Sequence, residues 1–100
     1  TRQALLAYER TVLDAFRSVE DALVEITTLK EQLKAREDRL NASLKAQYLS
    51  GERYDKGVTS YLEFLESQRQ AFESELNYVE TRQQLLNAYV NLYRVLGGDW

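Results

Sequence analysis

Two acidic side chains, Glu63 and Glu66, are the residues of this sequence best placed to do chemistry. They lie three positions apart, so a helix that begins just before them carries both on one face. One interpretation is that they stabilise a helix N-terminus, where the helix dipole favours carboxylates. The other is that several copies form a ring of carboxylates at the mouth of a multi-helix tube. Periodicity alone leaves both interpretations open.

Two tyrosines, Tyr54 and Tyr61, flank the glycine that precedes these acids. Aromatic rings on either side of a chain reversal commonly pack across it and hold it closed. Alternatively, their phenol groups could form a latch by hydrogen bonding to a neighbouring hairpin. Glu52 and Lys56 are spaced for an ion pair between residues i and i+4 of a helix.

The composition argues against an enzyme. The 100 residues include no His, Cys, Met or Pro, and the formal net charge is -3. Imidazole and thiolate groups, the usual general bases, nucleophiles and metal ligands, are therefore absent. We expect no catalytic activity, no metal and no cofactor. The mildly acidic balance without a basic block also makes nucleic acid an unexpected partner.

A chain reversal is predicted at Gly57, because glycine adopts the left-handed backbone conformation that ends many helices. Ser60 followed by Glu63 has the spacing of a capping box, in which each side chain satisfies a backbone N–H of a helix start. The first helix should therefore end near Lys56, and the second should begin near Ser60.

The first segment carries apolar residues at heptad spacing, which predicts a coiled-coil helix. The residues seven apart are Leu5, Val12, Val19, Ile26, Leu33 and Leu40, and those between them are Tyr8, Ala15, Ala22 and Leu29. A second row, formed by Phe16, Leu23 and Leu44, widens the apolar face. Such a wide face predicts contact with more than one neighbouring helix.

The second segment has the same kind of pattern and ends at Gly97 and Gly98, a helix stop. Its two rows are Leu65, Phe72, Val79, Leu86 and Tyr93, and Leu62, Leu76 and Val90. These rows predict that the second helix packs along the first.

The predicted fold is all-α: an antiparallel coiled-coil hairpin in a single domain. Its parts are a first helix over 1–56, a turn over 57–60, a second helix over 61–96 and a tail over 97–100. At about 1.5 Å per residue the first helix outreaches the second, so residues 1 to about 18 lack a partner in this chain. Since apolar residues occur there too, we expect an assembly. The chain starts inside a helical pattern without Met, and we interpret it as part of a longer protein.

Three stretches of the sequence resemble the TolC-like outer membrane factor family. RYDKGVTSYLEFLESQR at 53–69 is similar to the family's periplasmic turn, RY-x-x-G-x-x-S-Y-L-E-V-L-x-x-x-R. YERTVLDAFRSVEDAL at 8–23 and LYRVLGGDW at 92–100 resemble a family helix and a family ending. They occur in the family's order and span most of the chain.

This resemblance implies a trimeric outer membrane channel with a long periplasmic α-barrel, in a Gram-negative bacterium. Such channels are exit ducts of tripartite efflux pumps, working with a periplasmic adaptor and an inner membrane pump. They export drugs or other solutes, and this chain would be the helical, periplasmic part of the second repeat.

The resemblance also gives roles to the tip residues. Tyr54 stands at the tip tyrosine of the network that holds the entrance closed, and Glu63 and Glu66 stand at the two entrance-ring aspartates. Gly57 matches the turn glycine, expected to meet the adaptor. Thr59 replaces an arginine of the latch, a departure from the TolC-like charged latch.

Two alternatives come from other classes of protein. A periplasmic adaptor hairpin would have its own tip motif and lipoyl-like β segments, which the sequence does not show. A generic coiled-coil interaction module would explain the heptads but not the order of the three stretches.

Overall fold

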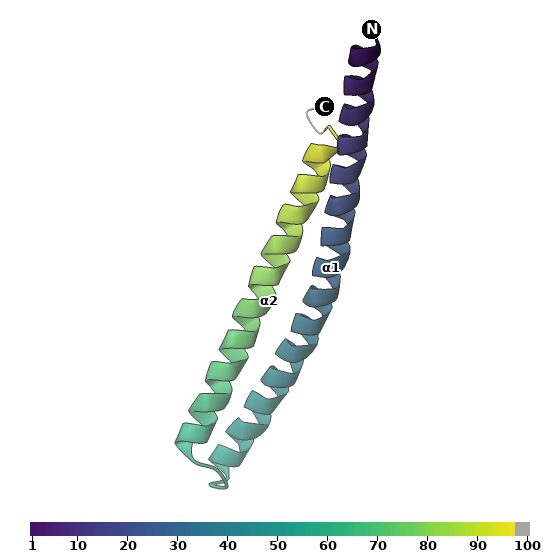
Figure 1. The fold of residues 1–100 in the computed structure, drawn as a ribbon. Helices are drawn as coiled ribbons and strands as arrows, with labels where there is room; N and C mark the ends of the chain where they lie inside the picture. The colour runs from purple at the N-terminus through teal and green to yellow at the C-terminus, as the bar shows by residue number, and fades with distance from the viewer. Residues whose placement is uncertain (98–100) are drawn as a thin grey trace. The chain divides into compact units, whose positions relative to one another are not determined.

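The computed structural model describes residues 1–97 and contains two long helices (Figure 1). Helix α1 spans Arg2–Asp55 and α2 spans Tyr61–Val95. No strand occurs between residues 1 and 97, so the chain is all-α, as its sequence predicts. Over the same residues, neither helix is long and apolar enough to cross a membrane. Of the predicted tail, residues 98–100 lie outside the described part.

The end of α1 is a Schellman motif centred on Gly57. This glycine has a φ of 74°, in the left-handed region. Its N–H donates to the Tyr54 carbonyl at 3.0 Å, and the Val58 N–H donates to the Arg53 carbonyl at 2.8 Å. These two bonds satisfy carbonyls that the helix end would otherwise leave unpaired. The chain therefore reverses at the glycine where the sequence predicts it.

The chain divides into two compact units. One comprises residues 31–83, and the other comprises residues 1–30 together with the chain from residue 84 onward. Each unit contains a stretch of α1 beside an antiparallel stretch of α2, and only the first contains the turn.

In the unit of residues 31–83, small and polar side chains form the contact between the helices. Ala71, Ser74 and Thr81 of α2 are buried. The Ser74 and Ser43 hydroxyl oxygens lie 2.9 Å apart and share a hydrogen bond across the two helices. Between residues 31 and 55, the half-buried residues of α1 are Leu33, Arg36, Leu40, Ser43, Gln47, Ser50 and Gly51. These positions continue the heptad spacing predicted for α1 as far as the tip, although the residues at those nearest the tip are polar.

The unit that includes both chain ends has a more apolar contact. Ala22 and Ile26 of α1 and Leu85 and Ala88 of α2 are buried. Lys30 Nζ lies 5.8 Å from the centre of the Tyr89 ring, a cation–π contact between the two helices.

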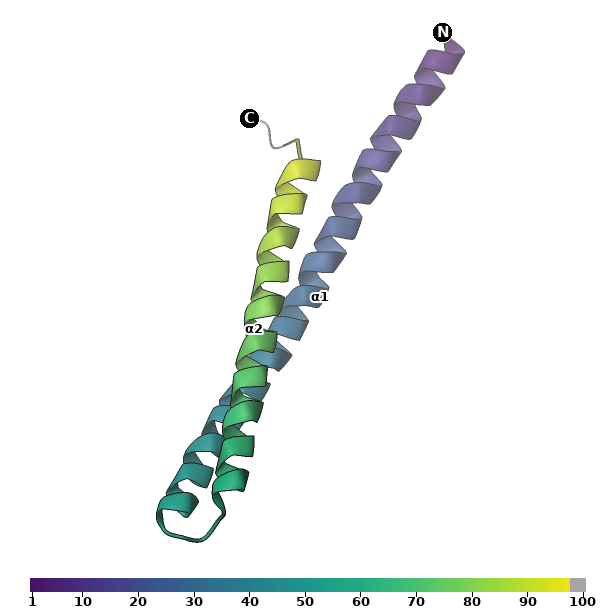
Figure 2. The ribbon, with the colours of Figure 1, turned by 90° about the vertical axis from the view of Figure 1, so that its left-hand side faces the viewer.

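Near the N-terminus, α1 continues beyond the end of α2 (Figure 2). The large apolar side chains there are exposed: Leu5, Leu6, Tyr8, Leu13 and Phe16. Their exposure agrees with the predicted lack of a partner for residues 1 to about 18.

The prediction for the contact face of α2 is wrong. Every member of the two predicted rows is exposed, from 40% for Leu65 to 76% for Leu62. The residues buried in α2 are instead Ala71, Ser74, Thr81, Leu85 and Ala88. Small side chains let two helices approach closely, and this close approach leaves the large apolar side chains on another face. Helix α2 therefore carries two stripes of residues at heptad spacing. Only the stripe with the smaller side chains contacts α1.

Candidate functional site

An aromatic cluster closes the tip of the hairpin. The Tyr54 ring lies 5.4 Å from the Tyr61 ring and is stacked on Phe64 at 5.6 Å, measured between centroids. Gly51 lies beneath this cluster, because a Cβ added there would come within 3.2 Å of Phe64 Cε1. Such aromatic pairs contribute about 0.5–1.5 kcal/mol beyond the apolar area that they bury. The packing interpretation of the two tyrosines is therefore confirmed, with Phe64 as a third member.

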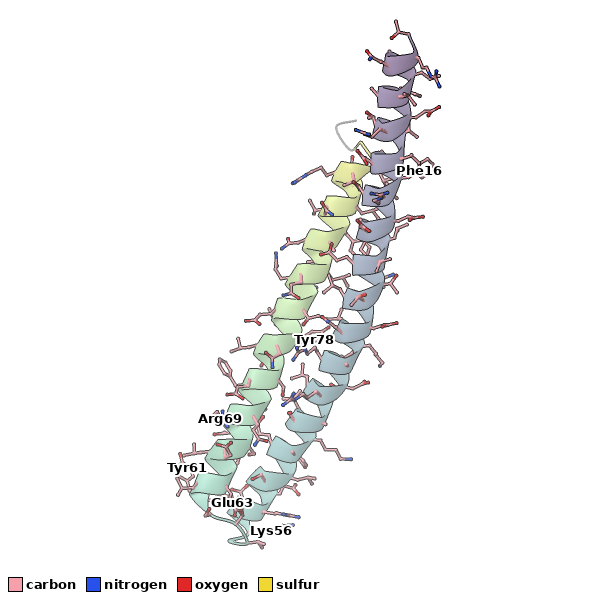
Figure 3. The ribbon with its side chains drawn as sticks, in the orientation of Figure 1. Phe16, Lys56, Tyr61, Glu63, Arg69 and Tyr78 are labelled. Atoms are coloured by element: carbon pink, nitrogen blue, oxygen red, sulfur yellow. The ribbon has the colours of Figure 1, made fainter. Side chains whose placement is uncertain are left out.

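Ser60 caps α2, but only half of the predicted capping box forms. The Ser60 hydroxyl oxygen accepts a hydrogen bond from the Glu63 backbone N–H at 3.2 Å. The Glu63 carboxylate does not return to the Ser60 backbone; it accepts a hydrogen bond from the Thr59 hydroxyl. Thr59 and Ser60 directly precede the first turn of α2. Figure 3 shows Tyr61 and Glu63 of this turn next to the chain reversal.

Glu66 is engaged by its own helix. Its carboxylate accepts from Arg69 Nε at 3.0 Å and from a second guanidinium nitrogen of the same arginine, a bidentate pair. Gln70 donates to it at 3.3 Å, and Arg69 also pairs with Glu73. The Arg69 guanidinium, one turn further along α2, lowers the pKa of Glu66 below its usual range. All these groups are exposed, so the network organises charge on the surface of α2.

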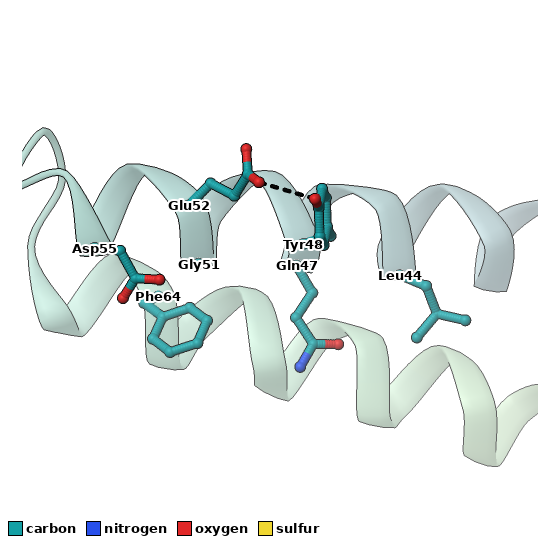
Figure 4. A pocket seen from close by; sticks show the side chains of 7 residues that line it. All are labelled: Leu44, Gln47, Tyr48, Gly51, Glu52, Asp55 and Phe64. Carbon is teal, nitrogen blue, oxygen red and sulfur yellow. Dashed lines mark hydrogen bonds between the residues drawn. The ribbon is translucent and has the colours of Figure 1, made fainter.

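Beside the tip lies a hollow of about 500 Å³ that is open to solvent (Figure 4). Its lining residues are Leu44, Gln47, Tyr48, Gly51, Glu52 and Asp55 of α1 and Phe64 of α2. The Tyr48 hydroxyl donates to the Glu52 carboxylate at 2.8 Å. Glu52 therefore pairs with Tyr48, one turn before it, and not with Lys56 as its spacing predicts.

The structure brings most of the predicted tip residues together. Tyr54 is held in the aromatic cluster, Gly57 forms the reversal, and Thr59 and Ser60 both bond to Glu63. The sequence also held signals for two features that its interpretation missed. Arg69 follows Glu66 by three residues and precedes Glu73 by four, the spacings of helical ion pairs. Tyr48 and Glu52 likewise lie four apart.

Comparison with known proteins identifies the family. A model described as "Outer membrane efflux protein" matches residues 1–98, nearly the whole chain. This match excludes both alternative interpretations of the sequence, the periplasmic adaptor hairpin and the generic coiled-coil module.

Curated relatives carry names that agree with this family. The chain is 40% identical over 97 residues to the outer membrane protein OprJ of Pseudomonas aeruginosa, covering 97% of this chain and 20% of OprJ. Over 93 residues it is 37% identical to the toluene efflux pump outer membrane protein TtgF and 39% identical to the antibiotic efflux pump outer membrane protein ArpC, both of Pseudomonas putida. Each of these matches covers 93% of this chain and 19% of the relative. The chain thus spans about a fifth of the length of these relatives. It belongs to the outer membrane efflux protein family, as a helical segment of the periplasmic part.

Proposed function

We propose that this chain forms part of the wall of a trimeric outer membrane channel, the exit duct of a tripartite efflux pump. The channel would work with a periplasmic adaptor and an inner membrane pump. The names of the relatives include toluene and antibiotics, so small organic compounds are the proposed cargo. The observation that carries this proposal, beside family membership, is the exposed apolar surface of both helices.

The regular spacing of that surface supports an assembly of several hairpins. On α2 an apolar stripe runs from Leu62 to Tyr93 at heptad spacing and is exposed throughout. On α1 a second row, which includes Phe16, Leu23 and Leu44, is exposed as well. Heptad stripes are typical of helices that pack on further helices. A wall in which every helix has a neighbour on each side would cover both.

The hairpin tip is the proposed entrance of the channel. Tyr54, held by its aromatic neighbours, would narrow the entrance, and Glu63 and Glu66 would give it negative charge. Thr59 and Ser60 bond to Glu63, and Arg69 bonds to Glu66, so each acid would keep its place as the hairpin moves. An adaptor that meets the reversal at Gly57 would separate neighbouring hairpins and open the duct.

The test of the charged entrance is single-channel recording on the full-length protein in planar bilayers. Glu63→Ala combined with Glu66→Ala should lower the preference of the channel for cations over anions. Glu80→Ala, which removes a charge from the same helix further from the tip, is the control. Unchanged selectivity in the double variant would remove the charged-entrance proposal.

Tyr54→Phe tests whether the phenol hydroxyl acts as a latch. The ring contacts with Tyr61 and Phe64 would persist in this variant, since they do not involve the hydroxyl. If the hydroxyl is a latch, the closed channel should leak modestly more current. An unaltered leak would assign Tyr54 to packing alone.

A further inference from the structure

Within the unit of residues 31–83, one side of the contact between α1 and α2 is polar. Two rows of residues at heptad spacing form this side, which we call the polar face: Arg39, Ala46 and Arg53 of α1, and Glu63, Gln70 and Asn77 of α2. Two hollows join the rows. Ala46, Arg53 and Glu63 line one of about 220 Å³, and Arg39, Gln70 and Asn77 line the other, of about 330 Å³.

The opposite side of the same contact carries large apolar side chains. Leu44 follows Arg39 by five residues, which places it about 140° further around α1. The Leu44 side chain is 45% exposed, and it lines the hollow beside the tip together with Phe64. The two sides of the hairpin therefore differ in polarity.

Arg39 carries the uncompensated charge of the polar face. The hollow that it lines also includes Arg69 and Glu73, but these two pair with each other. Nearer the tip, Arg53 and Glu63 line one hollow and contribute charges of opposite sign. The Arg39 side chain is exposed and forms no ion pair with any residue between 1 and 97. Its guanidinium is therefore free to act on ions in the surrounding water.

We propose that the polar face lines the water-filled duct and that Arg39 is a residue that determines which ions pass along it. The inference rests on the proposed function for the existence of the duct. Glu63, the proposed entrance acid, belongs to the same row as Gln70 and Asn77, so an α2 that turns Glu63 inward turns both amides inward as well. Large apolar side chains facing a narrow water column favour its dewetting, so the side that bears Leu44 is the outer one.

The position of Arg39 gives its charge a level of its own in the duct. It lies roughly 27 Å from the reversal at Gly57 along α1, at about 1.5 Å per residue. In a trimer, three copies would form a ring of positive charge at this level, beyond the acidic entrance. Such a ring favours the passage of anions over cations, and salt screens it.

Thiol labelling of the full-length channel in planar bilayers tests which side faces the duct. The chain contains no Cys, so Gln70→Cys introduces a single thiol into it. A charged methanethiosulfonate reagent should then lower the single-channel current. Glu75→Cys is the matched control, because both residues are exposed but Glu75 lies about 140° further around α2. A current that does not respond to the thiol at position 70, or responds equally to both thiols, would overturn the proposal.

Reversal potentials under a salt gradient test the role of Arg39. Arg39→Gln should raise the ratio of cation to anion permeability at least about twofold, and Arg39→Lys should leave it near the wild-type value. Arg82→Gln removes the same charge from a position about 140° around α2 from Asn77, so it should leave the ratio unchanged. A ratio that stays constant in Arg39→Gln, or rises equally in Arg82→Gln, would remove Arg39 from this role.

Conductance of the wild-type channel is recorded first. A wild type that forms no channel contradicts the proposed function, and this inference with it. A conducting channel whose current is unaffected by the thiol at position 70 contradicts this inference alone.

Discussion

At the scale of single residues, Gly57 decides where the chain reverses. Its φ of 74° is unfavourable for any residue with a Cβ, yet no atom beyond its two chain neighbours lies within 4 Å of the position that a Cβ would take. Gly57→Ala should therefore destabilise the hairpin through its backbone alone, by about 1–2 kcal/mol. Urea denaturation at one fixed protein concentration, followed by circular dichroism, measures the loss.

Gly57→Asn is the companion variant, because asparagine tolerates the left-handed conformation better than alanine. It should lose less stability than Gly57→Ala. Equal losses in the two variants would show that the left-handed backbone is not the cause.

Arg69 sets the protonation of Glu66. Because the pKa of Glu66 is lowered in the folded protein, this pairing stabilises the fold above the usual pKa of a glutamate. The stabilisation is lost as the pH falls through the lowered pKa of Glu66. Arg69→Gln should raise the pKa of Glu66 toward its ordinary value, as measured by a carbon-13 titration of the glutamate carboxyl groups.

Glu73→Gln is the control for this titration. It removes the other partner of Arg69 but leaves the bidentate pair with Glu66 in place. The pKa of Glu66 should therefore change less than in Arg69→Gln. A pKa of Glu66 that stays low without Arg69 would assign the lowering to another group.

At the scale of helices, the hydrogen bond between the Ser43 and Ser74 hydroxyls belongs to the contact between α1 and α2 within the unit of residues 31–83. Substitutions of these two serines test how much it stabilises that contact. Ser74→Ala leaves the half-buried Ser43 hydroxyl without its partner, which should cost about 1 kcal/mol. Ser43→Ala combined with Ser74→Ala removes both hydroxyls, so its cost should be smaller than the sum of the two single changes. Urea denaturation of the four proteins gives this cycle, and strictly additive losses would mean that the hydroxyls do not interact.

The helices also show how far sequence patterns lead. Large apolar residues at heptad spacing predicted the correct face of α1, where Ile26 and Leu29 are buried. On α2 the same rule selected Phe72 and Leu86, which are exposed. The rule failed there because periodicity shows that a stripe will be covered but not which helix covers it. The stripe that includes Ala71, Ser74 and Ala88 has the same periodicity. Its side chains carry little apolar surface, so a search for large apolar residues does not find it.

The tip shows the same division. Gly57 and Ser60 were predictable because each acts through local backbone geometry and hydrogen bonds. The hollow beside the tip was not predictable from the sequence, because it forms only when Phe64 of α2 lies against Gly51 of α1 across the reversal.

At the scale of the whole molecule, the exposed apolar surface predicts self-association. The described chain has few buried apolar side chains, while more than twenty large ones are exposed, including Leu13 and Phe16. We expect the 100-residue chain by itself to form oligomers or to fray over its first 16 residues. Sedimentation velocity measures association, and amide hydrogen exchange measures fraying.

Leu13→Ser combined with Phe16→Ser should reduce this association, since both side chains belong to the surface that lacks a partner. Ala88→Ser, at a buried position of the contact between the helices, serves as a comparison that leaves that surface intact. A sharp monomer whose helix is protected through residue 16 would contradict the expectation.

The sequence by itself determined the two helices, the reversal at Gly57 and the capping at Ser60, because these depend on residues near one another in the chain. It also determined the family, because the matched residues run through nearly the whole chain in one order. Only the tertiary structure decided which stripe of α2 meets α1, and therefore which apolar surface remains for other helices. That choice depends on how closely two helices can approach: Ala71 and Ser74 permit contact with α1, while Phe72 on the adjoining face extends away from it.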